Sequence, residues 1–352
     1  MSTHKTHREP VINQFGIFPV TVTAVQQLTE HYTRISLAGQ SLHHAVEEIS
    51  DGTGDVKDAY IKLMVPPPGT TAPVDFELND TWRRDYMSRE PDERGWMRTY
   101  TVRNSRLVDQ AGIAEAPTPF RPAEHADLSV MHRKLPDGKI PEIDIDFVLH
   151  ADAAGQMGPG AAWAANAKVG DTISFLAPMR GNNLWSSWEP GDAENILICV
   201  DETAVPAALS IVRSLPAEAR AQVLLEVPSA NDVLTEDQVD LTEVLRSLPN
   251  VSLTWLPRGC NGSSSVRGEE LYQQLRTILD VKLPERLGRT DTVTDDEIVW
   301  GLANHEHHQT YVFIAGESAV IKTLRRICVN DAGMDKNTVS FMGYWKRGKA
   351  ES

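Results

Sequence analysis

The chain has 352 residues, of which 41% are hydrophobic and 24% charged, and its formal net charge is −15. This length allows two domains with separate cores, and the negative charge argues against nucleic acid or an anionic membrane as the main partner. No apolar run approaches the ~20 residues of a membrane span. Because segment 1–10 also lacks the apolar core of a signal peptide, we expect a cytoplasmic protein without membrane insertion.

Cysteine and histidine spacing gives no sign of a metal site. Cys199, Cys260 and Cys328 lie far apart and form no CxxC pair, so neither a zinc site nor a cysteine-ligated iron–sulfur cluster is indicated. The His-Glu-His-His segment at 305–308 lacks the His-x-x-x-His spacing of a helical metal site and is predicted to be a solvated loop. We therefore expect no resident metal, and redox chemistry in this chain would use an organic cofactor.

The first half of the chain is predicted to be an antiparallel barrel. Short stretches that alternate apolar and polar residues, separated by turn-forming residues, are typical of antiparallel strands. Two strands are expected within 18–37, and four more at 59–65, 98–103, 143–150 and 171–178. One helix is expected at 158–167, and long irregular segments at 70–95 and 104–142. These elements form a six-stranded barrel with one helix.

The pattern changes after loop 180–193, which contains glycine, asparagine and proline and marks the expected domain boundary. Continuous apolar runs then alternate with helical segments, as in a parallel sheet that is buried on both faces. The expected strands are 196–200, 222–227, 251–255 and 311–315, and the expected helices are 204–215, 269–279 and 318–329. This alternation predicts a doubly wound α/β domain. The two expected domains are 15–185 and 192–350.

The segment 98–103, Arg-Thr-Tyr-Thr-Val-Arg, carries the most informative chemistry. On a strand, Arg98 and Tyr100 point to one side, whereas Thr99 and Thr101 point to the other. A guanidinium group, an aromatic ring and a hydroxyl are what a flavin dinucleotide needs for its pyrophosphate, its ring and its redox-active nitrogen edge. The six residues alone fit an ordinary barrel strand with solvated arginines equally well.

Further segments strengthen the flavin interpretation by their order and spacing: 146–150, 158–164, 201–207, 315–317 and 339–348. Together with 98–103 they resemble the siderophore-interacting, FAD-binding family of ferric-siderophore reductases, which belongs to the ferredoxin-reductase-like superfamily. The resemblance covers about residues 15–350. It implies a Greek-key barrel that binds FAD, followed by an α/β domain similar to an NAD(P)H-binding domain.

The resemblance implies most of the FAD contacts in the first domain. Arg98 would pair with the pyrophosphate, Tyr100 would pack against the flavin, and Thr101 would face the flavin N5 edge. Val148 and Leu149 would offer backbone groups to the pyrimidine edge of the flavin. His150 would touch the ribityl chain or a phosphate, with an ordinary half-buried histidine as the alternative. Gly158, Gly160 and Ala161 start a helix, where free amides attract phosphate.

The second domain would complete the cofactor site. The resemblance places Asp201 and Thr203 at the adenosine side of FAD, although Thr203 could instead cap the following helix. Trp345 would be a mobile aromatic cover over the flavin. Gly316 and Glu317 would lie near the nicotinamide path, with an ordinary helix start as the alternative.

The implied function is FAD-dependent reduction of ferric siderophores to release Fe(II), with NADH, NADPH or a reduced ferredoxin as electron donor. No residue is required for proton chemistry, since the electron transfer is outer-sphere. The expected siderophore-binding cations are Lys62, Arg258 and Lys346. Two alternatives stay open: a general NAD(P)H flavin or diaphorase-type reductase, and a non-catalytic flavin-containing siderophore-binding protein. We expect a monomer.

Overall fold

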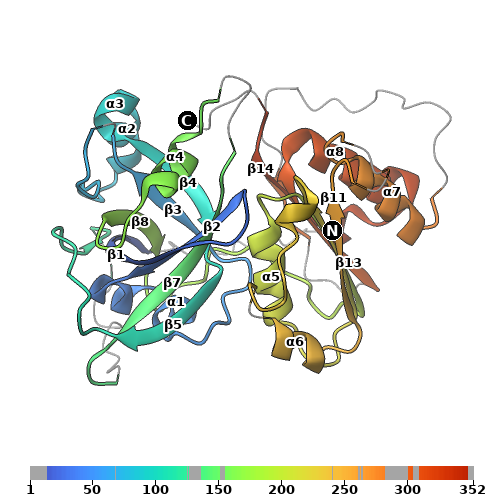
Figure 1. Ribbon diagram of the computed structural model, residues 1–352, viewed down its shortest axis with the longest axis horizontal. Coiled ribbons are helices and arrows are strands. Elements are labelled where there is room, and N and C mark those ends of the chain that lie inside the picture. Colours follow the sequence, from blue (N-terminus) through green and yellow to red (C-terminus); the bar gives the residue numbers. More distant parts are fainter. Residues whose placement is uncertain are drawn as a thin grey trace, which may run out of the picture.

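Two β-sheets lie side by side in the protein, one in each half of the chain (Figure 1). The computed structural model describes residues 14–67, 69–124, 126, 136–150, 155–239, 241–260, 262, 265–281, 300–303 and 309–347. The segment 305–308 and Gly348, which the sequence analysis named, lie outside these residues. Among the helices in these ranges, none has the length and apolar character needed to cross a bilayer.

The first sheet is antiparallel throughout, as predicted, and has the order β4-β3-β8-β1-β2-β7-β5, with β6 paired to β1. Its strands are β1 (Phe15–Gln27), β2 (Tyr32–Ala38), β3 (Tyr60–Val65), β4 (Trp96–Thr101), β5 (Asn104–Asp109), β6 (Arg121–Pro122), β7 (Lys139–Val148) and β8 (Thr172–Pro178). Helices connect and cover them: η1 (Gln40–His44), α1 (Glu47–Ser50), α2 (Trp82–Met87), α3 (Pro91–Arg94) and α4 (Pro159–Asn166).

Two segments that were predicted to be irregular contain regular structure. β5 lies within 104–142, and its Arg106 forms ion pairs with Glu142 and Asp144 of β7. This polar pairing hides the apolar alternation by which a strand is recognised. Helices α2 and α3 lie within 70–95, where Leu78 and Tyr86 are buried in a hydrophobic cluster with Ile17, Met64 and Leu176. The prediction that 70–95 is irregular was therefore wrong.

The second sheet has the order β11-β10-β9-β13-β14-β12 and is parallel except for β12, which runs antiparallel to β14. Its strands are β9 (Asn195–Val200), β10 (Ala221–Val227), β11 (Val251–Pro257), β12 (Trp300–Gly301), β13 (Thr310–Glu317) and β14 (Val339–Trp345). Its helices are α5 (Val205–Arg213), η3 (Ala230–Asp232), α6 (Thr242–Ser247), α7 (Glu269–Ile278), α8 (Ser318–Arg326), the π-helical turn η4 (Ile327–Asp331) and η5 (Lys336–Thr338). The prediction of a doubly wound parallel sheet is confirmed.

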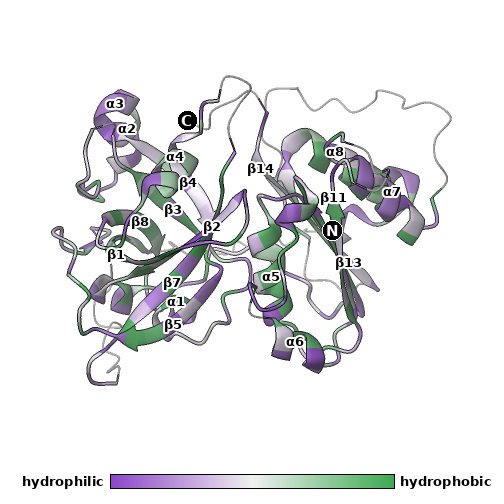
Figure 2. Ribbon diagram, viewed as in Figure 1, coloured by the Kyte–Doolittle hydropathy of each residue, from purple (hydrophilic) through white to green (hydrophobic). Residues whose placement is uncertain are grey.

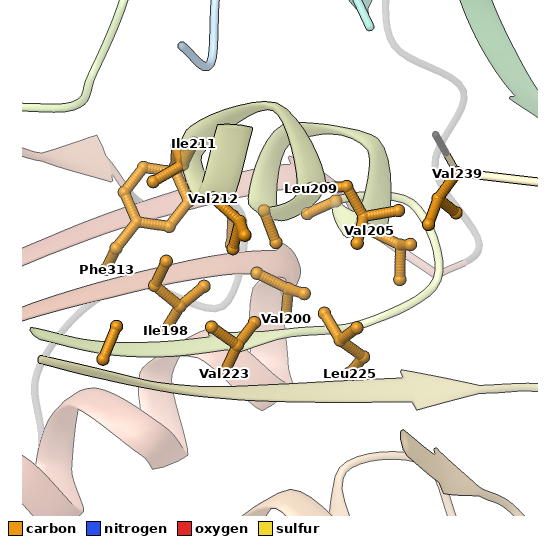
Figure 3. Close-up of a cluster of buried hydrophobic side chains, with 14 of the residues drawn as sticks. Ile198, Val200, Val205, Leu209, Ile211, Val212, Val223, Leu225, Val239 and Phe313 are labelled. Carbon is orange, nitrogen blue, oxygen red and sulfur yellow. The ribbon is translucent and has the colours of Figure 1, made fainter. Parts of the chain in front are cut away.

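Helix α5 lies between the two sheets. Figure 3 shows its side chains, among them Val205, Leu209 and Val212, packed on Ile198 of β9 and Leu225 of β10. All its residues except Arg213 are buried, and Figure 2 shows α5 as mainly hydrophobic, whereas α7 has both hydrophobic and hydrophilic surfaces. A helix that is apolar all round is buried on every side, so α5 joins the two sheets into one body.

Polar contacts also join the two domains. Asp232 of the second domain is fully buried and accepts hydrogen bonds from the Thr29 hydroxyl at 2.8 Å and from the His31 backbone N–H at 3.2 Å. Its carboxylate also lies 2.9 Å from Nδ1 of His31. Arg103 follows β4, and its buried guanidinium donates to the Val239 carbonyl. From the sequence, a solvated salt-bridge role was open for Arg103, and the burial of its side chain shows that this expectation was wrong.

Replacing Asp232 with alanine is expected to destabilise the protein by about 1–3 kcal/mol, because Thr29 and His31 lose a buried acceptor. The free energy of unfolding from denaturant titration measures this loss. Asp237→Ala is the matched control, since Asp237 is an exposed carboxylate on the same segment. Equal losses for both variants would contradict the assigned role of Asp232.

Candidate functional site

A cavity of about 400 Å³ lies between the two sheets, and we call it the interdomain cavity. The first domain lines it from β3, β4, β7 and α4 with Tyr60, Lys62, Arg98, Thr99, Tyr100, Thr101, Asp146, Val148, His150 and residues 158–161. The second domain lines it with Thr203, Pro206, Trp300, Gly343, Tyr344 and Trp345. Most of the residues that sequence reasoning selected for FAD therefore come together in one cavity.

Strand β4 supplies the central wall of the cavity. The ring of Tyr100 lies 4.4 Å from that of Phe147, centre to centre, and is tilted against the barrel core. A Cβ added at Gly160 would lie 2.1 Å from the Tyr100 hydroxyl, so only glycine allows this close approach between β4 and α4. Thr101 is buried and hydrogen-bonds to Tyr344 of the second domain.

The start of α4 faces the same space. Gly158 precedes the helix with extended backbone, Pro159 is in its first turn, and no side chain among the described residues caps it. The backbone amides at Gly160 and Ala161 thus begin the helix beside the cavity, where the helix dipole favours an anion. This arrangement agrees with a phosphate-binding role for the segment.

The residues at and after the end of β7 differ in whether they line the cavity. Val148 lines the cavity, whereas Leu149 does not, and the Leu149 N–H donates to the His31 carbonyl at 2.7 Å. That amide is therefore occupied, although FAD was expected to use it. His150 lines the cavity, and its ring centre lies 5.7 Å from that of Trp345.

Asp201 lies behind the cavity wall and holds several of its parts together. Its carboxylate is buried and accepts hydrogen bonds from the Thr203 N–H at 2.9 Å, the Glu317 N–H at 2.7 Å and the Trp345 indole N–H at 3.2 Å. A Cβ at Gly316 would lie 2.5 Å from the Asp201 carboxyl carbon. Asp201 thus positions two lining residues, Thr203 and Trp345, and is not itself a lining residue.

A helix start was the alternative for both Glu317 and Thr203, and it holds for Glu317 alone. Glu317 caps α8, since its carboxylate accepts the N–H groups of Ala319 at 2.7 Å and Val320 at 3.1 Å. The helix-start alternative therefore describes Glu317. Thr203 is not the cap of α5, which begins at Val205 after Ala204; its hydroxyl donates to Asp201 at 2.6 Å instead.

Of the three expected siderophore-binding cations, Lys62 lies in the cavity, where its ammonium group donates to the Thr99 hydroxyl at 2.6 Å. Arg258 is nearly buried and pairs with Glu202 at 2.9 Å and with Glu226 at 3.1 Å. Its charge is therefore used inside the second domain. Lys346 follows β14 and does not line the cavity.

Sequence reasoning missed several lining residues, and also Arg267, which does not line the cavity but lies against the lining residue Trp345. Tyr60 pairs with Thr101 in the β3–β4 register, which alternation along β3 could have indicated. Arg267 pairs with Glu202 at 2.5 Å, and its guanidinium lies 4.9 Å from the Trp345 ring centre. No local sequence pattern predicts either contact. Trp300 lies on the two-residue strand β12, which is too short for a periodic signal.

Burial, and to a smaller extent the neighbouring Glu202 carboxylate, raise the pKa of Asp201 to about 6. A raised carboxyl pKa means that the folded protein holds this proton more tightly than the unfolded chain does. The stability that this proton contributes is complete below the unfolded pKa, near 4, and is lost as the pH rises through about 6.

The indole N–H resonance of Trp345 is therefore expected to shift with a midpoint near pH 6, because its acceptor changes charge there. Nuclear magnetic resonance titration measures the shift, and Trp345→Phe identifies the signal. Asp201→Asn should abolish the transition while His150 is still present. If the transition persists unchanged in Asp201→Asn, another group causes it.

Both halves of the chain match models of known protein families. The family model for the siderophore-interacting FAD-binding domain matches residues 21–113 and 129–182. The model for the siderophore-interacting protein matches residues 193–348. The two matches adjoin at the loop that leads from the first sheet to the second.

Relatives agree with these matches. The ferric vibriobactin reductase ViuB of Vibrio cholerae is 28% identical over 210 residues, which cover 60% of this chain and 61% of ViuB. The siderophore-interacting protein SipS of Aeromonas hydrophila superposes with a TM-score of 0.55 at 22% identity, over 95% of this chain and 93% of SipS. A ferredoxin–NADP+ reductase of Plasmodium falciparum shares the fold, with a TM-score of 0.50 at 9% identity over 92% and 94% of the two chains. The chain belongs to the siderophore-interacting protein family, with an FAD-binding domain and a ferredoxin-reductase-like fold.

Proposed function

We propose that this protein is an FAD-dependent reductase of ferric siderophores that takes electrons from NADH or NADPH and releases Fe(II). The observation that carries the proposal is the interdomain cavity, which combines an uncapped helix start, a guanidinium group, aromatic side chains and a lysine in its described lining. Membership in the family supports FAD and siderophore binding. The Vibrio cholerae relative is a ferric vibriobactin reductase, and this similarity supports reductase activity.

The residues present fit FAD. Arg98 lines the cavity on the same strand as Tyr100, so a pyrophosphate paired with its guanidinium would lie near the start of α4. The amides of Gly160 and Ala161 would supply further donors to that phosphate. Tyr100 would pack on the flavin or its ribityl chain, and the close approach at Gly160 fixes its position.

When bound, FAD accepts two electrons from a nicotinamide and passes them on singly. The chain has to bind and orient the cofactor, exclude water from one side of it, and hold an iron chelate within electron-transfer distance. Lys62 would attract an anionic chelate, which the overall charge of −15 would otherwise repel. Iron arrives in its chelate as substrate, so none of these steps needs a protein ligand to iron or a proton donor.

The electron donor, NADH or NADPH, would bind to the second domain. Nucleotides bind at the carboxyl edge of parallel sheets, and here that edge carries Asp201, Glu202 and Glu317. Because two of these carboxylates adjoin at the end of β9, we propose that the nicotinamide pyrophosphate does not bind directly over β9. A reduced ferredoxin is the alternative donor.

Anaerobic rapid mixing tests the proposal. NADH or NADPH is expected to bleach the flavin absorbance of the purified protein, and a ferric siderophore is expected to restore it while Fe(II) is trapped by a colorimetric chelator. Bleaching without reoxidation by any ferric chelate would favour the diaphorase-type alternative. Tight chelate binding without bleaching by NADH, NADPH or reduced ferredoxin would favour the binding protein.

Arg98→Ala is expected to weaken FAD binding by roughly 10- to 100-fold, because a charge-assisted pair is lost. Arg98→Lys should recover part of this loss, since a lysine keeps the charge but not the bidentate geometry. Equilibrium titration of the flavin-free protein with FAD measures both. Arg84→Ala is the control, as Arg84 is an exposed arginine of the same domain. Unchanged affinity in Arg98→Ala would overturn the pyrophosphate assignment.

Gly160→Ala is expected to weaken FAD binding by at least tenfold, because the added methyl group displaces the Tyr100 ring. The matched control is Gly158→Ala, where an added Cβ meets nothing within 4 Å and φ is −61°. Thermal unfolding of both variants checks that the fold is retained. Similar FAD affinities for the two variants would show that the position of Tyr100 does not matter for binding.

A further inference from the structure

Two aromatic side chains, Tyr60 and Trp300, line the interdomain cavity, and Trp185, which is not a lining residue, stacks on Tyr60. We call these three residues the aromatic shelf. The rings of Tyr60 and Trp185 are stacked with centres 5.7 Å apart. Trp300 meets Tyr60 edge to face at 6.3 Å. The shelf thus joins a strand of the first domain, the loop between the domains and β12 of the second domain.

Trp300 is the unusual member, because an indole in the cavity wall is 48% exposed. Its backbone is fixed by pairing with Met342 of β14. The next residue is Gly301, where an added Cβ would lie 2.4 Å from the Phe341 ring. This glycine lets β12 lie against β14 and holds Trp300 at the cavity. An exposed aromatic surface at such a place is typical of a binding site.

Lys62 adds a cation to the shelf. Its ammonium nitrogen lies 5.7 Å from the centre of the Tyr60 ring, and the residue lines the cavity. A ligand that fits this combination has flat aryl groups, which stack on the rings, and anionic oxygens, which pair with the lysine. Iron chelates built from catecholate groups have both features. Chelates built from hydroxamate groups have aliphatic arms and offer no aryl face.

We propose that the aromatic shelf selects ferric chelates with aryl ligand groups, and that Trp300 determines this preference. The inference rests on the proposed function, because it names the class of chelate that the site takes. Trp300 touches the chelate and takes no part in the redox step, so it is a specificity-determining residue.

Redox-inert gallium(III) chelates separate binding from reduction. The FAD-loaded protein is titrated by calorimetry with the gallium complexes of a hexadentate tris-catecholate and of a hexadentate trihydroxamate. The native protein is expected to bind the tris-catecholate at least tenfold more tightly. Trp300→Leu should abolish most of this preference without changing the affinity for the trihydroxamate, and Trp300→Phe should retain it in part.

Leu302→Ala is the matched control, since Leu302 is exposed two residues further along and does not line the cavity. It should keep the native preference, and the flavin content of every variant checks the fold. An unchanged preference in Trp300→Leu, or an equal loss of affinity for both chelates, would overturn the role of the shelf. Failure of the native protein to bind either chelate would instead contradict the proposed siderophore function.

Discussion

The site depends on the buried carboxylate of Asp201, because this group accepts hydrogen bonds from several segments that surround the cavity. It lies just after β9, and its hydrogen bonds reach Glu317 at the end of β13 and Trp345 at the end of β14. Three parallel strands thus end around one acceptor, and the segment that leads into α5 is tied to it through Thr203. Buried amide and indole donors without an acceptor would each be costly. The close approach of Gly316 shows that the neighbouring backbone has no room for a larger group.

Carboxylates of the second domain also limit which cations are available to a ligand, because they pair with its arginines. Glu202 pairs with both Arg258 and Arg267, and Glu226 pairs with Arg258. Taking one carboxylate away would leave a buried guanidinium poorly compensated, so these arginines serve the packing of the second domain. Among the residues that the structure describes, the arginine and lysine side chains that line the interdomain cavity are Arg98 and Lys62, both from the first domain. In a protein with a net charge of −15, anionic groups of a cofactor and of a chelate are therefore attracted mainly to the first domain's side of the cavity.

Local patterns predict the two sheets and much of the cavity. Alternation brings Arg98 and Tyr100 to the cavity, and apolar runs separated by helices give the parallel sheet with α5 against it. Contacts between distant segments lie outside such patterns. The partners of Arg258 are 56 and 32 residues away along the chain, so nothing local distinguishes it from a solvated arginine. β5 was missed for a related reason, because its Arg106 pairs with acidic residues of β7 in place of an apolar face. The sequence therefore predicts the role of a charged residue best when its partner is close along the chain or when the residue belongs to a ligand-binding motif.

Trp345 and Trp300 differ in a way that bears on how the cavity opens. Trp345 donates to buried Asp201, lies under the Arg267 guanidinium and meets the His150 ring. Swinging it aside would break the hydrogen bond and the cation–π contact together, which makes a freely mobile cover costly. Trp300 has one aromatic neighbour among the described residues, Tyr60, and is half exposed. A ligand that enters past β12 can contact Trp300 without disturbing Asp201. Among the described residues, displacing Trp300 would therefore break fewer contacts than displacing Trp345, whose hydrogen bond to Asp201 helps to keep the three strand ends together.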